Sequence, residues 1–262
     1  MAGTTSNRRF RDWLLEARMQ AQLCHALYGG RDAVFDLGAV VHGDARFFEV
    51  GHVRAAVIIF SDHAHLSVCG SNALHDWVDN INARQEPFWG QKAHAGFMHA
   101  TYSLRDAFSK GELWSFIDDR PVIYGGHSAG GAIANLLTFF QMPKAMFTFG
   151  APRVFAPETA AAVAAQRWEE FRFVLPGDHV PHLPLRSFRR LFGSAKYAHA
   201  SAELLLRDDG SVVMERSVWD DVKEAVLRGW LTVRGLKRAP ERHSIVRYRN
   251  AILNACKQEN LL

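Results

Sequence analysis

The chain alternates short apolar runs with stretches in which apolar residues recur every three or four positions. The short runs predict strands at 54–60, 65–68, 121–124, 145–149 and 171–175. The helical spacing predicts helices at about 6–27, 96–110, 132–140, 158–168 and 245–255. Turn residues at 61–63 and 208–210 predict two hairpins, the second joining 202–206 to 211–214. Strands that alternate with helices favour an α/β fold with a mostly parallel central sheet.

Composition limits the class of protein without naming its function. The chain has 262 residues, of which 48% are hydrophobic, so we expect one domain, 1–262, with a large core. The formal charge of +4 is modest, and the basic residues are not interleaved with an aromatic platform, which argues against nucleic-acid binding. Two basic clusters are expected to be solvated faces, or alternatively to attract anionic lipid headgroups; they are Arg186, Arg189 and Arg190, and Arg234, Lys237, Arg238, Arg242, Arg247 and Arg249.

The most informative segment is the pentapeptide Gly126-His127-Ser128-Ala129-Gly130. It lies between a predicted strand and a predicted helix and has the pattern G-x-S-x-G. At such a turn the serine hydroxyl is exposed, and the two glycines let strand and helix approach closely. The amides at the start of the helix point towards any oxyanion that forms beside the serine. We therefore predict that Ser128 is a nucleophile.

A serine nucleophile needs a base and an acid, which follow it in the order Ser, Asp or Glu, His in this type of fold. Asp178 comes directly after the strand at 171–175, where catalytic groups of open α/β sheets collect. The histidines that follow it are His179, His182, His199 and His243. His179 and His182 are too near Asp178 in sequence, so we predict His243 as the base and keep His199 as the alternative.

Five ordered blocks resemble the class 3 lipases, the fungal-lipase-like branch of the α/β-hydrolases, over about residues 47–248. They are Gly126 to Gly131, Thr148-Phe149-Gly150-Ala151-Pro152-Arg153-Val154, the block around Asp178 to Pro184, Tyr197-Ala198-His199, and His243 with Tyr248. The resemblance implies the α/β-hydrolase fold. It also implies Asp178 as the triad acid, His243 as the triad base and a structural role for His199.

A sixth block, Val68-Cys69-Gly70-Ser71, resembles the oxyanion loop of that family. By this resemblance the amides of Ser71 and Ala129 form the oxyanion hole. The chain departs from the family at Cys69, where an arginine is usual.

The segment after this loop has one apolar face, formed by Leu74, Trp77, Val78 and Ile81. In the lipases that it resembles, this helix forms or borders a lid; the alternative is permanent packing on the core. Phe88 and Trp89 follow, and they either line an acyl site or cover the sheet.

We therefore predict a serine carboxylester hydrolase, a lipase or esterase acting on acylglycerols or related fatty-acid esters without metal or cofactor. The alternatives are a short-chain or aryl esterase, a phospholipase A1 and a non-catalytic binding scaffold. The partners expected are a lipid or small ester substrate and a transient lipid interface. His63 and His65 are explained by their place in a hairpin, and the cluster of Asp178, His179 and His182 by the triad, so no metal site is expected.

The start of the chain and the cysteines bear on location. Charged residues at Arg8, Arg9, Arg11 and Asp12 interrupt any apolar leader, and the helix at 6–27 is expected to pack on the core or lie on a membrane surface. Cys24, Cys69 and Cys256 are odd in number and lack metal-ligand spacing. These features predict a cytoplasmic location.

Overall fold

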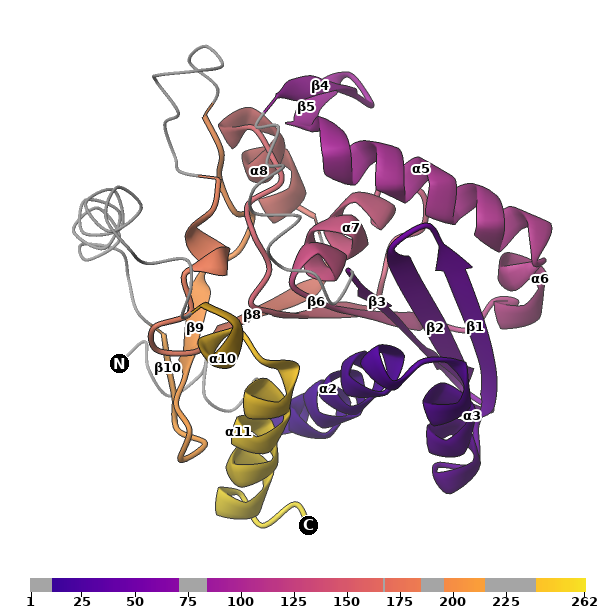
Figure 1. The fold of residues 1–262 in the computed structure, drawn as a ribbon, viewed down its shortest axis with the longest axis vertical. Coiled ribbons are helices and arrows are strands. Elements are labelled where there is room, and N and C mark those ends of the chain that lie inside the picture. Colours follow the sequence, from indigo (N-terminus) through magenta and orange to yellow (C-terminus); the bar gives the residue numbers. More distant parts are fainter. Residues whose placement is uncertain (1–10, 71–83, 167, 185–195, 215–238) are drawn as a thin grey trace.

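A twisted sheet runs through the centre of the computed structural model, which describes residues 11–70, 84–166, 168–184, 196–214 and 239–262 (Figure 1). Its strands, in spatial order, are β1 (Asp44–Val50), β2 (Val53–Ile59), β3 (Ala64–Cys69), β6 (Val122–His127), β7 (Ala145–Phe149), β8 (Glu169–Val174), β9 (Glu203–Leu206) and β10 (Val212–Met214). Strands β3, β6, β7, β8 and β9 pair in parallel. The pairs β1/β2, β2/β3 and β9/β10 are antiparallel. The predicted mostly parallel sheet and both predicted hairpins are confirmed.

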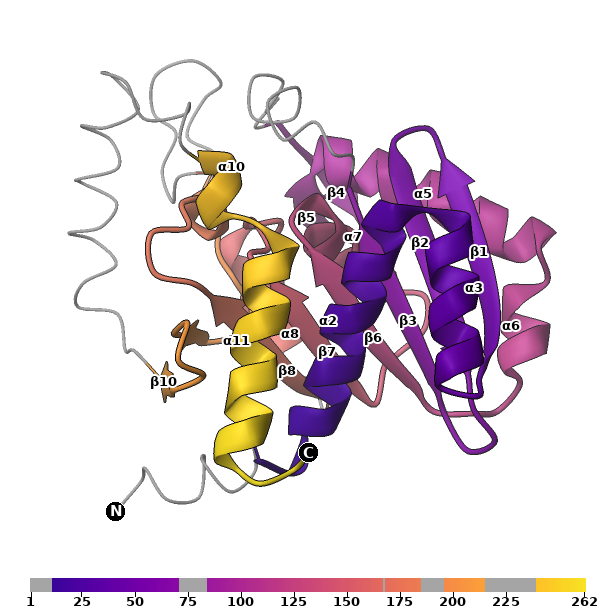
Figure 2. The same cartoon turned by 60° about the horizontal axis from the view of Figure 1, so that its bottom comes forward.

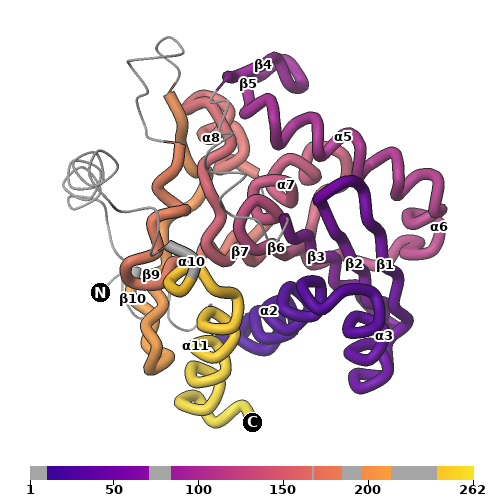
Figure 3. Tube along the Cα trace, in the orientation of Figure 1, coloured from indigo at the N-terminus to yellow at the C-terminus, as the bar shows by residue number. Residues whose placement is uncertain are grey.

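Helices cover both faces of this sheet (Figure 2). One face carries α2 (Leu14–Gly29), α3 (Arg31–Val40) and α11 (Ile245–Gln258). The other face carries α5 (Ala95–Lys110), α6 (Leu113–Ile117), α7 (Ala129–Leu137) and α8 (Pro157–Ala164). Helices α2 and α11 come from opposite ends of the sequence and lie side by side, as the tube in Figure 3 makes plain. Among the described residues, no helix is both long enough and apolar enough to cross a membrane.

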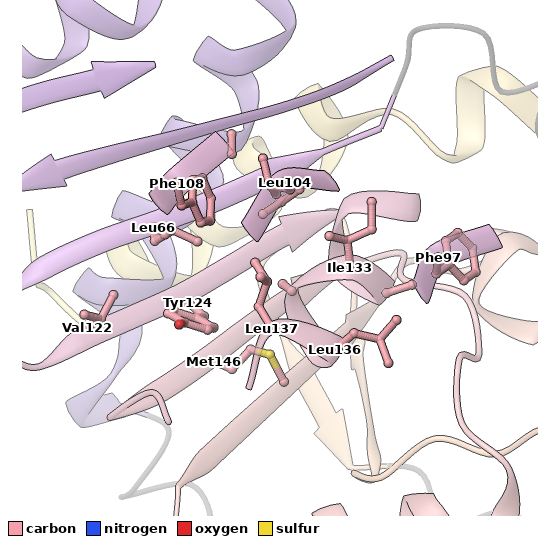
Figure 4. Close-up of a cluster of buried hydrophobic side chains, with 14 of the residues drawn as sticks. Leu66, Phe97, Leu104, Phe108, Val122, Tyr124, Ile133, Leu136, Leu137 and Met146 are labelled. Atoms are coloured by element: carbon pink, nitrogen blue, oxygen red, sulfur yellow. The ribbon is translucent and has the colours of Figure 1, made fainter. Parts of the chain in front are cut away.

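The core explains why the central strands are continuous apolar runs. Every residue of β6 is buried, because α2 covers one face of the strand and α7 covers the other. On the second face, Leu66, Tyr124 and Met146 of the sheet contact a layer from α5 and α7 that includes Leu104 and Leu137 (Figure 4). With both faces covered, a strand has no solvent side on which to place polar residues.

The sequence did not predict several of the observed elements. Strand β1 and helices α3 and α6 were not expected, and the helix predicted at 158–168 ends at Ala164, before the chain enters β8 at Glu169. The segment around Phe88 forms a small separate hairpin, β4 (Gln85–Phe88) and β5 (Gln91–His94), which turns at Trp89 and Gly90. Both turn residues have positive φ, 50° and 72°, as two-residue hairpin turns require.

The two aromatic residues of this hairpin have different surroundings. Phe88 is buried and contacts the rings of Tyr102 and Phe139, so it covers the core. Trp89 is exposed and meets Phe140 edge-on. Of the two interpretations of Phe88, packing is the one that its contacts favour.

Candidate active site

Ser128 lies between β6 and α7, at the edge of the sheet where the parallel strands end. Its backbone has φ 58° and ψ −136°, a conformation that non-glycine residues rarely adopt. The turn is held by two backbone hydrogen bonds, from the Ser128 amide to the Phe149 carbonyl (3.0 Å) and from the Gly131 amide to the Ser128 carbonyl (2.9 Å). This strained strand-to-helix turn has the geometry of a nucleophile elbow.

The two glycines of the pentapeptide are required by close contacts between backbones. A Cβ on Gly130 would lie 2.1 Å from the Val68 carbonyl oxygen, and one on Gly126 would lie 2.6 Å from the carbonyl oxygen of Gly130. Neither separation is compatible with a side chain. The pentapeptide therefore seats α7 against the ends of β3 and β6, which fixes the direction of the Ser128 turn.

Asp178 and His243 meet beside this turn although 65 residues separate them in the chain. Asp178 follows β8, and His243 lies between the short helix α10 (Ala239–Arg242) and α11. His243 Nδ1 donates to Asp178 Oδ2 at 2.8 Å, and both side chains are buried. His243 Nε2 is also buried, and no described group is bonded to it. The pair thus has the arrangement of an imidazole oriented by a carboxylate, with the second ring nitrogen open.

Gly150 brings the two halves of the site together. It follows Phe149, whose carbonyl accepts from the Ser128 amide, and it has φ 64°. A Cβ placed on Gly150 would lie 2.8 Å from both Asp178 Oδ2 and His243 Cε1. The end of β7 therefore connects Ser128 on one side to the Asp178–His243 pair on the other.

Tyr248 is a further part of the site whose role the sequence did not indicate. Its hydroxyl donates to Asp178 Oδ2 at 2.6 Å and accepts from the Leu175 amide at 3.2 Å. Burial, followed by the charge of Asp178, raises the pKa of Tyr248 far above its ordinary value, so the hydroxyl remains a donor. The H-x-x-x-x-Y spacing was visible in the sequence, but the contact depends on how α11 docks.

His127 and Tyr28 were also missed. The His127 ring stacks on the His243 ring, with centroids 4.7 Å apart, and His127 Nε2 lies 2.9 Å from the His243 carbonyl oxygen. Because a carbonyl only accepts, Nε2 carries the proton, and Nδ1 accepts from the Tyr28 hydroxyl at 2.7 Å. Burial lowers the pKa of His127 far below its usual value, which keeps the ring neutral. Through these two hydrogen bonds, Tyr28 and His127 fix the position of the His243 backbone.

The loop after Asp178 is fixed by two other groups. His199 Nε2 donates to the Pro181 carbonyl at 2.7 Å, and burial lowers the pKa of His199 well below its normal range. Arg153 donates to the carbonyls of His182 (2.5 Å) and Pro184 (3.0 Å). His199 therefore has a loop-holding contact, while His243 is the histidine that contacts Asp178.

The predicted oxyanion hole is described in part. Ala129 is the first residue of α7, and the amides of a first helical turn have no intrahelical partner. Gly70 lies against it, since a Cβ on Gly70 would be 2.9 Å from Ala129 Cβ. Cys69, where the family has arginine, is buried with Leu23 and Leu27 of α2, and burial raises the pKa of its thiol to about 12. Its environment is that of a packing residue.

Some predicted residues lie outside the described part of the chain. They are Ser71 of the oxyanion loop, Leu74, Trp77, Val78 and Ile81 of the lid segment, and the basic residues Arg186, Arg189, Arg190, Arg234, Lys237 and Arg238. Of the remaining basic residues, Arg247 pairs with Asp208 at 2.8 Å, and Arg249 donates to His25 at 3.1 Å. Arg242 is exposed.

Known proteins resemble this chain in sequence and in fold. It is 27% identical over 216 residues to the secreted mono- and diacylglycerol lipase 1 of Fusarium solani, an alignment covering 76% of this chain and 60% of that protein. The Rhizomucor miehei lipase in its native propeptide complex superposes with a TM-score of 0.63 at 20% identity, over 78% of this chain and 70% of that one. The mono- and diacylglycerol lipase of Aspergillus oryzae superposes with a TM-score of 0.57 at 24% identity, over 74% and 78%. The fold is the predicted α/β-hydrolase fold.

These relatives correct the expected cytoplasmic location. The proteins from Fusarium solani and Penicillium cyclopium are named as secreted lipases, which contradicts it. The inference from the odd number of cysteines fails for a physical reason. Cys24, Cys69 and Cys256 are all buried and free, so they are packing residues and carry no information about the redox compartment.

The match to a family model is centred on the site. Residues 65–188 fit the model described as lipase (class 3), a range that begins in β3 and includes both Ser128 and Asp178. The sequence alignments with the Fusarium solani and Penicillium cyclopium proteins span about 60% and 55% of their lengths. The family model, the fungal relatives and the shared fold all support a likeness of this chain to the class 3, fungal-lipase-like family.

Proposed function

We propose that the protein is a serine carboxylester hydrolase that cleaves acylglycerols or related fatty-acid esters. The observation that carries this proposal is the hydrogen bond between His243 Nδ1 and Asp178 Oδ2, formed beside the strained turn of Ser128. A buried carboxylate, an imidazole with a free Nε2 and a serine on an elbow are the three groups that acyl transfer through an acyl-enzyme needs. The relatives named as mono- and diacylglycerol lipases support acylglycerols as the substrate class.

In the proposed reaction, Ser128 Oγ attacks the ester carbonyl carbon while its proton passes to His243 Nε2. Asp178 stabilises the imidazolium and keeps the ring in the required tautomer. The amides of Ala129 and Ser71 stabilise the negative charge on the carbonyl oxygen. His243 then returns the proton to the leaving alcohol, and the acyl group stays on Ser128. A water molecule, deprotonated by His243, hydrolyses this ester and releases the fatty acid.

Tyr248, His127 and Tyr28 act in this scheme as positioning residues. Tyr248 donates to the same carboxylate oxygen as His243 does, so it limits rotation of Asp178. His127, held by Tyr28, anchors the backbone of His243 and supports its ring face. A misplaced imidazole lowers the rate steeply, because proton transfer requires the donor and acceptor within hydrogen-bond reach.

The nucleophile is tested by labelling with a fluorophosphonate, which reacts with activated serines. The wild type is expected to be labelled at Ser128, and Ser128→Ala to lose both labelling and nearly all ester hydrolysis while keeping the wild-type circular dichroism spectrum. Ser109→Ala is the matched control, because Ser109 is exposed on α5 and donates only to the Arg105 carbonyl. Labelling that persists in Ser128→Ala, or that maps to another serine, contradicts the assignment. Failure of the wild type to react favours a non-catalytic binding scaffold.

Substrate preference is tested with p-nitrophenyl esters from acetate to palmitate, with and without an emulsion. A preference for long chains and a rise in rate at the interface fit a lipase whose lid is the segment of Leu74, Trp77, Val78 and Ile81. A preference for acetate or aryl esters favours a short-chain or aryl esterase. Hydrolysis of phosphatidylcholine at the sn-1 position favours a phospholipase A1. By analogy with its secreted relatives, we propose that the protein works outside the cell.

A further inference from the structure

Three potential metal ligands meet at the end of the sheet opposite Ser128. Glu16 lies in the first turn of α2, His63 lies in the turn between β2 and β3, and His65 belongs to β3. The register of β3 and β6 pairs Ala64 with Val122 at this end and Cys69 with His127 at the catalytic end. The cluster is therefore separate from the proposed active site by the length of the strand.

The distances within the cluster suit a small divalent ion. One ligand atom from each of Glu16, His63 and His65 lies within 4.8 Å of the other two, and His65 Nε2 lies 2.9 Å from Glu16 Oε2. Zinc bonds to nitrogen and oxygen are about 2.0–2.2 Å, so tetrahedral ligand atoms lie roughly 3.3–3.6 Å apart. Changes of about an ångström, within the reach of side-chain rotation, would bring the three atoms onto one ion.

The surroundings prepare the two histidines for this role. His63 Nδ1 bonds to Asp62 Oδ1 at 2.7 Å, which leaves its Nε2 free to bind. A carboxylate behind an imidazole is the usual way in which proteins orient a histidine ligand of zinc. The Phe60 ring stacks on His63 with centroids 4.8 Å apart and meets His65 edge-on. His65 is buried, and its Nε2 already lies against the Glu16 carboxylate.

We propose that Glu16, His63 and His65 bind a divalent transition metal, best matched by Zn²⁺, with water in the remaining position. A set of two histidines and one carboxylate is a known zinc ligand set. The ion takes the place of the proton between His65 Nε2 and Glu16, and that proton moves to Nδ1 in the other neutral tautomer. Lys144 interacts electrostatically with Glu16 and Asp62, so its positive charge opposes the ion and weakens binding.

The consequence for the fold is a cross-link between α2 and the β2–β3 hairpin. Glu16 is 47 residues from His63 in sequence, so one ion would add a metal cross-link between two segments that already meet through the Glu16–His65 and Gln20–Ser67 contacts. Helix α2 also carries Tyr28, which bonds to His127 at the other end of the sheet. Zinc is expected to stabilise the folded chain, because it binds the folded and not the unfolded arrangement.

The test uses tag-free, chelator-treated protein, so that no engineered histidines bind the metal. Isothermal titration with Zn²⁺ should give one equivalent bound by the wild type, and Co²⁺ should give the visible absorption bands of a four-coordinate nitrogen–oxygen site. His63→Gln and Glu16→Gln should each lower the affinity at least about 10- to 100-fold, the loss seen even when an outer partner of a ligand is removed. Zinc should raise the midpoint of thermal unfolding of the wild type and have little effect on either variant.

His52→Gln is the matched control, because His52 is an exposed histidine in the turn between β1 and β2. Ser128→Ala should bind zinc as the wild type does, which separates this site from the proposed catalytic one. Wild-type protein that binds no zinc at about 100 μM, or variants at Glu16 and His63 with unchanged affinity, would overturn the proposal. Because both substitutions are in partly exposed side chains, their circular dichroism spectra can be compared directly with the wild type.

Discussion

The hydroxyl of Tyr248 offers a sharp test of the site's architecture, since Tyr248→Phe removes one oxygen atom and little else. The hydroxyl donates to Asp178 at 2.6 Å and accepts from the Leu175 amide at 3.2 Å, and all three groups are buried. A hydrogen bond to a charged group contributes about 1.5–3 kcal/mol, and leaving a buried amide unpaired costs about 1–3 kcal/mol. Because the two losses share one atom and are not additive, we expect the free energy of unfolding to fall by about 2–4 kcal/mol.

This loss is measured by urea unfolding followed by tryptophan fluorescence and circular dichroism. An unchanged m-value with a lower midpoint would show that stability has changed and the exposed surface has not. At roughly 2–4 °C per kcal/mol for a chain of this size, the thermal midpoint should fall by roughly 5–15 °C. The kcat for ester hydrolysis should also fall, with little change in KM, because Asp178 loses one of the groups that orient it.

Tyr124→Phe is the matched control. Tyr124 is equally buried, but none of the described groups bonds to its hydroxyl. Deleting an unpaired buried hydroxyl should leave stability unchanged or raise it. Equal losses in the two variants, within about 0.5 kcal/mol, would refute the reasoning, since they would trace the effect to the tyrosine ring and not to the Asp178 contact.

Three other experiments test separate features. His243→Ala should lower kcat by at least about a thousandfold, as loss of a triad member does elsewhere. His199→Ala should mainly lower the free energy of unfolding. If kinetics and urea unfolding showed the opposite assignment of these two effects, His199 and not His243 would be the base. Gly150→Ala should lower kcat strongly, because its Cβ would lie 2.8 Å from Asp178 Oδ2. Gly51→Ala is the control, because Gly51 has a similar positive φ (59° against 64°) but a Cβ there would lie in open space, so kcat should not change. Equal activities of the two variants would contradict this account. Burial lowers the pKa of His94 to about 4. Below pH ~6.5 the unfolded chain therefore binds more protons than the folded chain does. The free energy of unfolding should fall as the pH drops from about 6.5 towards 4, by up to about 1.4 kcal/mol per pH unit. His94→Leu should flatten that slope of unfolding free energy against pH, and an unchanged slope would show that His94 is not the titrating group.

The sequence alone determined the features that depend on local spacing. The strand, the glycine-flanked Ser128 and the helix that follows are contiguous, so period and turn chemistry suffice to predict them. The position of Asp178 at a strand end and the β2–β3 and β9–β10 hairpins follow from the same local signals. Strand β1 and the β4–β5 hairpin gave no such signal, because edge strands are half exposed and lack a long apolar run.

Tertiary structure decided which distant groups meet. The contact of His243 with Asp178, the support of His127 by Tyr28 and the meeting of Glu16 with His63 each join segments dozens of residues apart. Such contacts follow from strand order and from the docking of α2 and α11, which are set by the packing of the whole core and not by any local pattern. The same limit explains the wrong inference from the cysteines, since a count in sequence does not reveal that all three thiols are buried and free. The physical reason is that periodicity specifies which face of an element is buried, whereas only the assembled core specifies what that face touches.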